Sequence, residues 1–309
     1  MADNYIKVAD LNPLNFVDAN RLQPANYHFK HFNKWKTSEQ LLPFEVAPGY
    51  SQKWQTDDII KLQVKANFGP VNVYIIDENG VVINSLAMDL VATVVNDYYF
   101  ECAIALTGLH GCYKIQIKAG DPVQTTLESE CFSVADTQPE TLLFTYSNNF
   151  NNDVYFESGI FFNMRVEGCL SDFVPSGNRV VYLDQPQNSK TVKGVSSRQF
   201  KLYIGSSEGV PDYIADKIQK IFDLNNVDID GVGFSAIEGA KLTPKREDYY
   251  QYAGWSLDVS PTINRGGKIF TSTGIQDKKI IMEVFANNKL FGPIGTPVND
   301  NTIIITELN

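Results

Sequence analysis

Hydrophobic and polar residues alternate along much of the chain between residues 50 and 136. In the segment KIQIK, Ile115 and Ile117 point to one side while the polar residues point to the other, as in a half-buried strand. Turn residues such as Phe68-Gly69-Pro70 separate seven segments of this kind: SQKWQ, IIKLQVKAN, VNVYIID, VVINSLAM, YYFECAIAL, CYKIQIKAG and TLESECFSV. Short strands with turns at intervals of about 8–12 residues are typical of a β-sandwich.

One short motif refines this expectation. Leu109, Gly111 and Tyr113 precede the KIQI strand, and their spacing is similar to the tyrosine corner of immunoglobulin-like and fibronectin-like sandwiches. In that corner a tyrosine hydroxyl bonds to nearby backbone and fixes the connection between the two sheets. We therefore expect an immunoglobulin-like β-sandwich over residues 46–136.

A second region begins after the boundary near residues 135–139 and extends to residue 309. It opens with TLLFTYSNNFNNDVYF, whose Asn-rich run from Ser147 to Asp153 predicts a hairpin tip between LLFTY and VYF, since Asn favours turns. Further predicted strands follow: FFNMRVEG, RVVYLD, RQFKLYIG, VGFSAIEG, YAGWSLDV, IIMEVFAN and TIIITEL. The region therefore predicts a β-rich (α+β) domain over residues 137–309.

A single amphipathic helix is expected in this domain, near residues 211–223. Pro211 suits a first helical position and Asp212 the positive end of the helix dipole. Apolar residues then recur at helical spacing: Ile214, Ile218, Ile221 and Phe222. They form one apolar face, which we expect to cover a sheet. A long loop is predicted near residues 261–278, where Gly266-Gly267 stands among Ser and Thr residues.

Both ends of the chain lack a sustained pattern. Residues 1–45 carry several prolines and the aromatic–basic stretch NYHFKHFNKWK, and are expected to form an extended arm. Such an arm orders either against its own chain or against a neighbour, and the sequence leaves both alternatives open. The same holds for the apolar run Thr302–Thr306, which is either a strand of its own domain or an edge that pairs with another subunit.

Composition narrows the function classes. The chain has 43% hydrophobic and 20% charged residues, which is typical of a folded globular protein. Its net charge of -10 disfavours a basic face for duplex nucleic acid, which needs clustered Lys and Arg. We find no apolar run of signal-peptide length at the start and none near the roughly 18 residues that span a bilayer, so we expect folding in a cytoplasm.

Candidate catalytic and metal-binding residues are scarce. The three histidines, His28, His31 and His110, do not assemble with a nucleophile into a recognisable triad, and the His28–His31 pair lacks a third metal ligand nearby. The sequence also has no P-loop, dinucleotide-binding or GxSxG motif. We therefore expect no enzyme activity, no catalytic residues, no cofactor and no metal.

The cysteines fit the same picture. Their spacing has no CxxC pair: Cys102, Cys112, Cys131 and Cys169. Reduced, buried thiols are the expectation, with a Cys102–Cys112 bridge between neighbouring strands as the alternative.

Two short segments imitate ion sites. Asn226-Val227-Asp228-Ile229-Asp230-Gly231 resembles a calcium loop, but the acid required at its twelfth position falls on Ile237. We interpret it as a strand that enters an Asp-Gly turn. The glycine-flanked segment from Gly205 to Val210 precedes the helix, where an anion could rest. Because it lacks a P-loop Lys, we interpret it as a connecting turn.

Two longer stretches resemble a protein family. One is SECFSVADTQPETLLFTYSNNFNNDVYF; the other is YIGSSEGVPDYIADKIQKIFDLNNVDIDGVGFSAIEG. Together they are similar to structural proteins of tailed phages of Bacteroidetes hosts, including the crAss-like group, and the similarity spans roughly Gln52 to Trp255. The resemblance implies a virion protein without catalytic residues, in a tail or ring assembly near the portal or baseplate. Its partners would be further copies in a ring and other tail or portal-proximal proteins.

Two other functions remain open from the sequence. A carbohydrate-binding or receptor-binding β-sandwich would use an aromatic platform, for which Trp35, Trp54 and Trp255 are the candidates. An uncharacterised hydrolase is the third interpretation, and no motif supports it. The sequence therefore favours a structural protein whose role is assembly.

Overall fold

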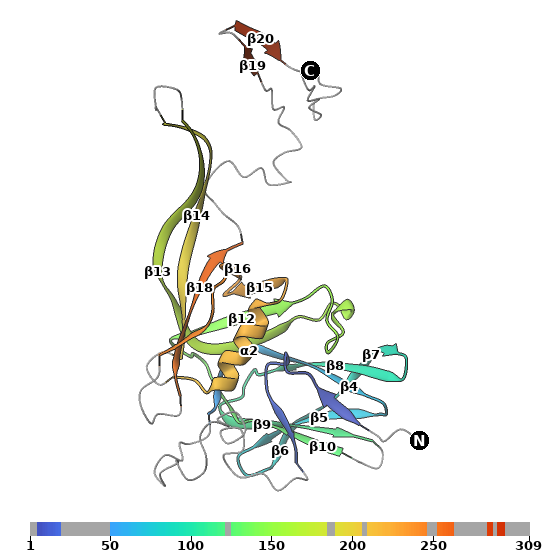
Figure 1. The fold of residues 1–309 in the computed structure, drawn as a ribbon. Coiled ribbons are helices and arrows are strands. Elements are labelled where there is room, and N and C mark those ends of the chain that lie inside the picture. Colours follow the sequence, from blue (N-terminus) through green and yellow to red (C-terminus); the bar gives the residue numbers. More distant parts are fainter. Residues whose placement is uncertain are drawn as a thin grey trace, which may run out of the picture. The chain divides into compact units, whose positions relative to one another are not determined.

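The computed structural model describes residues 5–19, 50–120, 125–183, 189–205, 209–245, 252–262, 283–286 and 289–293 (Figure 1). Strands make up most of the chain, so the mostly β prediction is confirmed. The chain divides into two compact units. Met1–Pro175 and Arg198–Ile263 form the first, and Ser176–Ser197 and Asn264–Asn309 form the second.

Two sheets face each other in the N-terminal part of the first unit. One sheet has the strand order β1-β4-β8-β7, with β1 (Ile6–Val8), β4 (Ile59–Ala66), β8 (Asp97–Ala105) and β7 (Asp89–Val94). In the other, β9 (Gly111–Ala119) pairs with β5 (Val71–Asp77) on one side and with β10 (Thr125–Ser129) and β11 (Phe132–Ala135) on the other. Outer strands complete this sheet: β6 (Val82–Ala87), β2 (Phe16–Asp18) and β3 (Gln52–Gln55).

A hydrophobic core lies between these two sheets. Ile115 and Ile117 are fully buried in it, as their alternation with polar residues predicts. Trp54 and Phe132 are the largest side chains that join them. The predicted strand TLESECFSV is divided into β10 and β11 by Glu130 and Cys131. Strand β7 was not predicted, because its apolar residues continue those of the segment before it.

The second β-rich region of the first unit is a barrel. Its sheet has the order β14-β13-β12-β15-β16-β18-β17, and a further pairing of β14 with β18 closes six of these strands into a ring. The strands are β12 (Thr141–Ser147), β13 (Phe162–Leu183), β14 (Ser189–Ile204), β15 (Asn226–Ile229), β16 (Val232–Ala236), β17 (Thr243–Lys245) and β18 (Gly254–Pro261). The predicted strands FFNMRVEG and RVVYLD are parts of the single strand β13.

The predicted amphipathic helix is confirmed as α2 (Asp212–Phe222), which lies against the barrel (Figure 1). Ile214, Ile218 and Ile221 are fully buried in the barrel core, and the Phe222 ring packs edge-on against Phe144. Each buried isoleucine contributes about 1.5–3 kcal/mol relative to an exposed one. Burial of this face, rather than helix propensity, therefore accounts for most of the stability of so short a helix.

The Asn-rich segment differs from its prediction. It was expected to be a hairpin tip between LLFTY and VYF, but the strand that pairs with β12 begins only at Phe162. The amide groups of Asp153 and Val154 both donate to the Asn151 side chain, which turns the chain where extended structure was predicted. Phe156 then begins the short 3-10 helix η3 (Phe156–Ser158).

Several predicted segments lie at or beyond the limits of the described residues. Of the expected N-terminal arm, residues 5–19 are described, and they add β1 and β2 to the two sheets of the sandwich. Residues 20–45 of the arm and the run Thr302–Thr306 lie outside the described part, as does nearly all of the loop near 261–278. In the second unit, β19 (Glu283–Ala286) pairs with β20 (Lys289–Pro293).

Buried polar contacts join the sandwich to the barrel. The Arg165 guanidinium on β13 donates two hydrogen bonds, of 2.7 and 2.8 Å, to the Asp58 carboxylate. Lys217 of α2 donates to the Asn12 carbonyl at 2.7 Å, and the hydroxyl of Tyr213 bonds to Glu130. Because buried charges and amides are costly when unpaired, these contacts fix how the two regions meet.

Candidate functional site

The residues considered for chemistry do not come together in the structure. His110 is exposed at the turn before β9, and the Tyr113 hydroxyl donates to its carbonyl at 2.8 Å. The backbone hydrogen bond predicted for Tyr113 is therefore confirmed, and the residue has a structural role. His28 and His31 lie outside the described residues. Among the described residues, no group of three or more His, Cys, Asp or Glu could hold a metal ion.

The segment that imitates a calcium loop is a hairpin, as interpreted from the sequence. Asp230 and Gly231 have φ of 49° and 77°, the left-handed backbone of a two-residue turn, and Ile229 pairs with Val232 across it. The Asp230 carboxylate accepts the amide of Leu143 at 3.0 Å, so it holds the turn against β12.

The glycine-flanked turn before α2 does not present free amides for an anion at its described positions. The amide of Gly209 donates to the Gly205 carbonyl, and that of Val210 donates to the Ala253 carbonyl. These bonds fix the start of the helix against the residues before β18, which supports the interpretation as a connecting turn.

An aromatic platform is not formed by the described tryptophans. Trp54 is fully buried in the sandwich core, and Trp255 is half-buried against the barrel core. Trp35 lies outside the described residues.

The four cysteines are free, so the alternative bridge between Cys102 and Cys112 is not formed, but the expectation of buried thiols is wrong: Cys169 is exposed and the other three are half-buried. Burial raises the pKa of Cys102 to about 12 and that of Cys112 to about 11. Thiols with such pKa values are poor nucleophiles at neutral pH.

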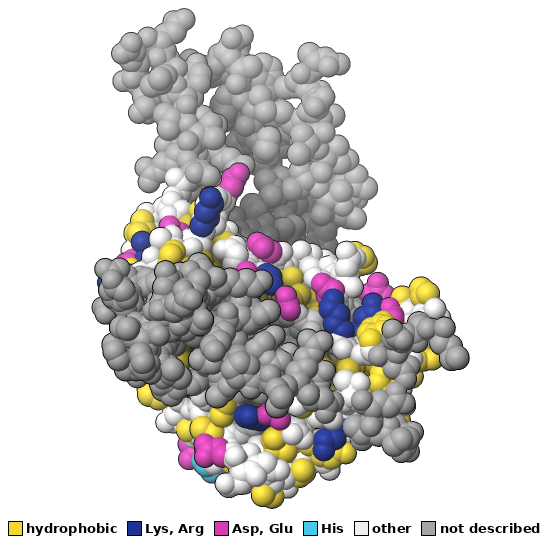
Figure 2. Space-filling model, turned by 60° about the horizontal axis from the view of Figure 1, so that its bottom comes forward, with side chains coloured by type: hydrophobic (Ala, Val, Ile, Leu, Met, Phe, Trp, Pro, Cys, Tyr) yellow, Lys and Arg dark blue, Asp and Glu magenta, His cyan; other side chains and the backbone are white. Residues whose placement is uncertain are grey.

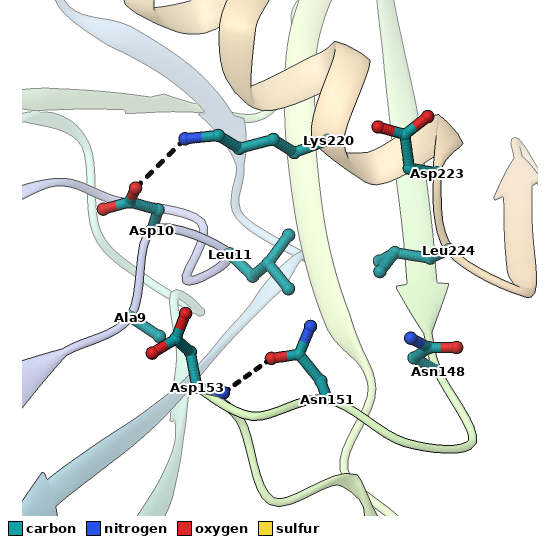
Figure 3. Close-up of a pocket in the computed structure, with 9 residues that line it drawn as sticks. All are labelled: Ala9, Asp10, Leu11, Asn148, Asn151, Asp153, Lys220, Asp223 and Leu224. Carbon is teal, nitrogen blue, oxygen red and sulfur yellow. Dashed lines mark hydrogen bonds and ion pairs between the residues drawn. The ribbon is translucent and has the colours of Figure 1, made fainter.

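A surface pocket lies between the Asn-rich connection, the N-terminal segment and the end of α2 (Figure 3). Its volume is about 290 Å³, and both polar and apolar residues line it: Ala9, Asp10, Leu11, Asn148, Asn151, Asp153, Lys220, Asp223 and Leu224. Lys220 pairs with Asp10 at 3.0 Å, and Asp153 pairs with Lys7 at 2.8 Å. Two of the three acids of the lining are thus paired with lysines, and we assign no ligand to this pocket.

The largest unexplained feature is an apolar edge of the sandwich, which we term the rim (residues 81–95). Strand β6 passes into β7 through Met88, so this edge crosses from one sheet to the other. Among the described residues, each of the two strands pairs on one side only, β6 with β5 and β7 with β8. The rim exposes seven large aliphatic side chains: Val81, Val82, Ile83, Leu90, Val91, Val94 and Val95.

The rim is unusual for a free edge of a sheet. Leu90 pairs across the strands with Phe100, whose side chain is buried, yet Leu90 itself is 55% exposed. Figure 2 shows hydrophobic side chains reaching the surface of the sandwich. Natural proteins protect such edges with Lys, Pro or short strands, whereas residues 81–95 contain one charged residue, Asp89, and no proline. The rim was not predicted from the sequence, although its run of aliphatic residues around the single charge of Asp89 was a usable signal.

A second exposed segment is the part of β13 that follows its pairing with β12. Strand β12 pairs with β13 only up to Glu167, and β18 pairs with β14 only from Phe200. From Ser171 to Pro175 successive residues are exposed on both faces, among them Phe173 and Val174 at 51% each.

Comparison with known protein families, with curated proteins and with solved structures finds no match to this chain. Among the described residues, none of the helices has the length and apolar character to cross a membrane. The geometry of the rim is therefore the main structural observation that bears on function.

Proposed function

We propose that this chain is a non-enzymatic structural subunit whose role is assembly with other subunits in the tail or a ring of a bacteriophage particle. The observation that carries the proposal is the rim, a continuous sheet edge with seven exposed aliphatic side chains. An unprotected edge of this kind is a template for pairing with another chain. In a stable soluble protein such an edge is retained where a partner covers it.

The free energy gained by burying the rim side chains on association indicates the kind of assembly. Six of the seven side chains are already about half buried, and Val95 is 89% exposed, so that covering each gains about 1 kcal/mol or slightly more, or about 7 kcal/mol for all seven. The loss of translational and rotational freedom on association costs about 4–15 kcal/mol. The rim alone is therefore marginal for a lone dimer, whereas a ring in which each subunit makes two contacts gains from both.

The proposal includes a more specific fold assignment for the two-sheet region than a mostly β class. We assign the region of residues 46–136 to the immunoglobulin-like sandwiches. The strand order β1-β4-β8-β7, the parallel pairing of β3 with β11 and the Tyr113 hydrogen bond support this assignment. Sandwiches of this kind are common assembly modules and need no catalytic site.

The placement in a phage particle rests on the sequence resemblance. The first resembling stretch covers β11, β12 and the Asn-rich connection, and the second covers the end of β14, α2 and the β15–β16 hairpin. Both stretches are parts of the framework and lie outside the rim, as expected where a family shares a fold skeleton rather than a site. The proposed partners are further copies in a ring and other tail or portal-proximal proteins, without direct recognition of nucleic acid.

Mass spectrometry of purified particles tests the proposal. Phage particles from the strain that encodes this chain are separated from free protein on a density gradient, and their proteins are quantified against the major capsid protein. We expect the chain at a fixed copy number per particle that resists washing in high salt. Its recovery only in the free-protein fractions would reject a virion role.

The carbohydrate-binding alternative gains no support from the described residues. Of its candidate platform residues, Trp54 is inaccessible and Trp255 is half-buried. We therefore retain assembly as the single proposed function.

A further inference from the structure

We propose that Cys112 and Cys131 form a thiol pair that closes reversibly into a disulfide on the outer face of the sandwich. Cys112 belongs to β9, and Cys131 directly precedes β11, the strand that pairs with β9. Both side chains are half-buried. The chemistry of this pair is independent of the assembly function proposed above.

The strand register places the two cysteines on the same face of the sheet. In the antiparallel pair of β9 and β11, Cys112 lies opposite Ser133. Side chains alternate between the two faces of a strand, so Cys131, two positions before Ser133, points to the same face as Cys112. This is the outer face, because the side chain of Phe132, which points the other way, is fully buried in the core. The two thiols are therefore diagonal neighbours.

A direct contact between the thiols agrees with this register. The Cys112 thiol is within hydrogen-bonding reach of the Cys131 thiol and of the Glu78 carboxylate. Glu78 directly follows β5, the strand on the other side of β9, and the register of that pair places it beside Cys112 as well. Among the described residues, no group of three or more such side chains could hold a metal ion. The chemistry open to the pair is therefore a bond between its two sulfur atoms.

The backbone at Cys131 accommodates this bond by a small shift. Diagonal neighbours in a regular sheet have Cα atoms about 7–8 Å apart, whereas about 4.4–6.8 Å is usual in a disulfide. Cys131 lies outside regular structure, in the break between β10 and β11, where the chain is free of the strand pairing that would oppose the shift. Because strained disulfides are readily reduced, we expect a bond that forms and opens with the surrounding redox conditions.

A low-molecular-weight disulfide such as oxidised glutathione serves as the oxidant. The Cys131 thiolate attacks one sulfur of glutathione disulfide, whose S–S bond breaks and releases one glutathione. Cys112 then loses its proton and attacks the Cys131 sulfur, which releases the second glutathione. The two cysteines thus lose two protons and two electrons, which the two glutathione thiols take up. Burial raises the pKa of Cys112 to about 11, so this second step is slow at neutral pH and faster in alkaline solution.

The crosslink restrains the segment through which the sandwich contacts α2. Glu130, the neighbour of Cys131, accepts hydrogen bonds from the Asn15 amide at 3.2 Å and from the Tyr213 hydroxyl of α2. A disulfide closes the chain between β9 and β11 into a loop and stabilises mainly by restricting the unfolded state. We expect the melting temperature of the oxidised chain to exceed that of the reduced chain by about 5 °C.

Oxidation of the full-length chain tests the pair. The reduced chain is incubated with oxidised glutathione at a pH of about 9, alkylated, and digested with chymotrypsin, which cleaves after Leu109 and so separates Cys102 from Cys112. Mass spectrometry should find Cys112 linked to Cys131 in most of the chain. The exposed Cys169 should instead carry glutathione. Dithiothreitol should reverse both the link and the rise in melting temperature.

Two single variants provide the comparison. Cys131→Ser removes one sulfur of the pair, so the link and the rise in melting temperature should both be lost. Cys102→Ala is the matched control, because Cys102 is also half-buried but lies on β8 in the other sheet. This control should form the link as the unmodified chain does. Circular dichroism verifies that each variant folds.

Three other results would overturn the proposal. Glutathione attached separately to Cys112 and to Cys131 would show that the two sulfur atoms do not reach each other. A link from either residue to Cys102 or Cys169 would assign the chemistry to a different pair, and thiols that both stay reduced would exclude the reaction. Each of these results is obtained from the unmodified chain, so the test holds even where a variant fails to fold.

Discussion

The barrel and the sandwich differ in how far the edge strands of their sheets are paired. In the barrel, pairing of β14 with β18 closes six strands into a ring, so that within the paired region these six strands have no open edge, and only the short β17 is added outside the ring. In the sandwich, by contrast, β6 and β7 each have one unpaired side among the described residues, and they expose aliphatic side chains. Under the proposed function, the closed barrel supplies stability, and among the terminal strands of the sandwich the aliphatic β6–β7 edge is the one that a partner covers.

The largest effects should come from the two hydrophobic cores, which we expect to unfold together. Trp54→Ala in the sandwich and Phe144→Ala in the barrel each remove a fully buried ring and should each cost about 3–5 kcal/mol. Because buried polar contacts join the two regions, both variants should shift one common calorimetric transition. Two separate transitions, each moved by only one of the variants, would show that the regions fold independently.

Loss of the ion pair between the two regions should have a slightly smaller effect. Arg165→Ala leaves the Asp58 carboxylate, whose side chain is 3% exposed, without its partner, and should lower the free energy of unfolding by about 3 kcal/mol or more. Urea denaturation provides the measurement.

The matched control for Arg165 is Lys114→Ala. Lys114 pairs with Glu128 at 2.7 Å, but its side chain is 42% exposed, so its loss should cost less than about 1 kcal/mol. Equal losses for the two variants would contradict the role assigned to the buried pair.

The sequence was sufficient to predict four features: the mostly β class, the helix α2, the Asp230-Gly231 turn and the Tyr113 hydrogen bond. Each of them depends on residues that are close together in the chain. The closure of the barrel was not predicted, since pairing of Leu202 with Leu257 joins strands far apart in sequence. The Asn-rich hairpin was wrong because a side-chain hydrogen bond at Asn151 decides the local turn. The rim was missed because exposure of aliphatic residues cannot be seen from their alternation alone.

A pH-dependent stability is expected at the junction of sandwich and barrel. Burial lowers the pKa of Lys217 to about 8, from 10.5. Between these values the unfolded chain binds more protons than the folded one, so the cost of burying Lys217 declines as the pH rises. From pH about 7.5 to about 9.5, the free energy of unfolding should rise by about 2 kcal/mol relative to that of Lys217→Met.

Lys220→Met is the control for that titration. Salt-bridge partners raise the pKa of the half-exposed Lys220, with burial as an opposing effect, so this lysine stays charged over the same window. Urea denaturation at several pH values should give a constant difference between the unmodified chain and Lys220→Met. If the difference in free energy of unfolding between the unmodified chain and Lys217→Met were also independent of pH, Lys217 would not have the lowered pKa described above.

The smallest effect is expected at the turn before β9. Tyr113→Phe removes the hydrogen bond to the His110 carbonyl and should cost about 1 kcal/mol. Tyr74→Phe is a suitable control, since the Tyr74 ring, rather than its hydroxyl, contacts Lys118. Thermal melting that fails to separate these two variants would remove the support that the Tyr113 bond gives to the sandwich assignment.

The central claim is that the open edge of the sandwich is covered by a partner, whereas the closed barrel is not. Hydrogen–deuterium exchange of the free chain and of the assembled form tests it most directly. We predict that assembly slows exchange in peptides that cover residues 81–95 and leaves those of β12, β15 and β16 unchanged. Equal exchange of the rim in both forms, or protection confined to the barrel strands, would contradict the account.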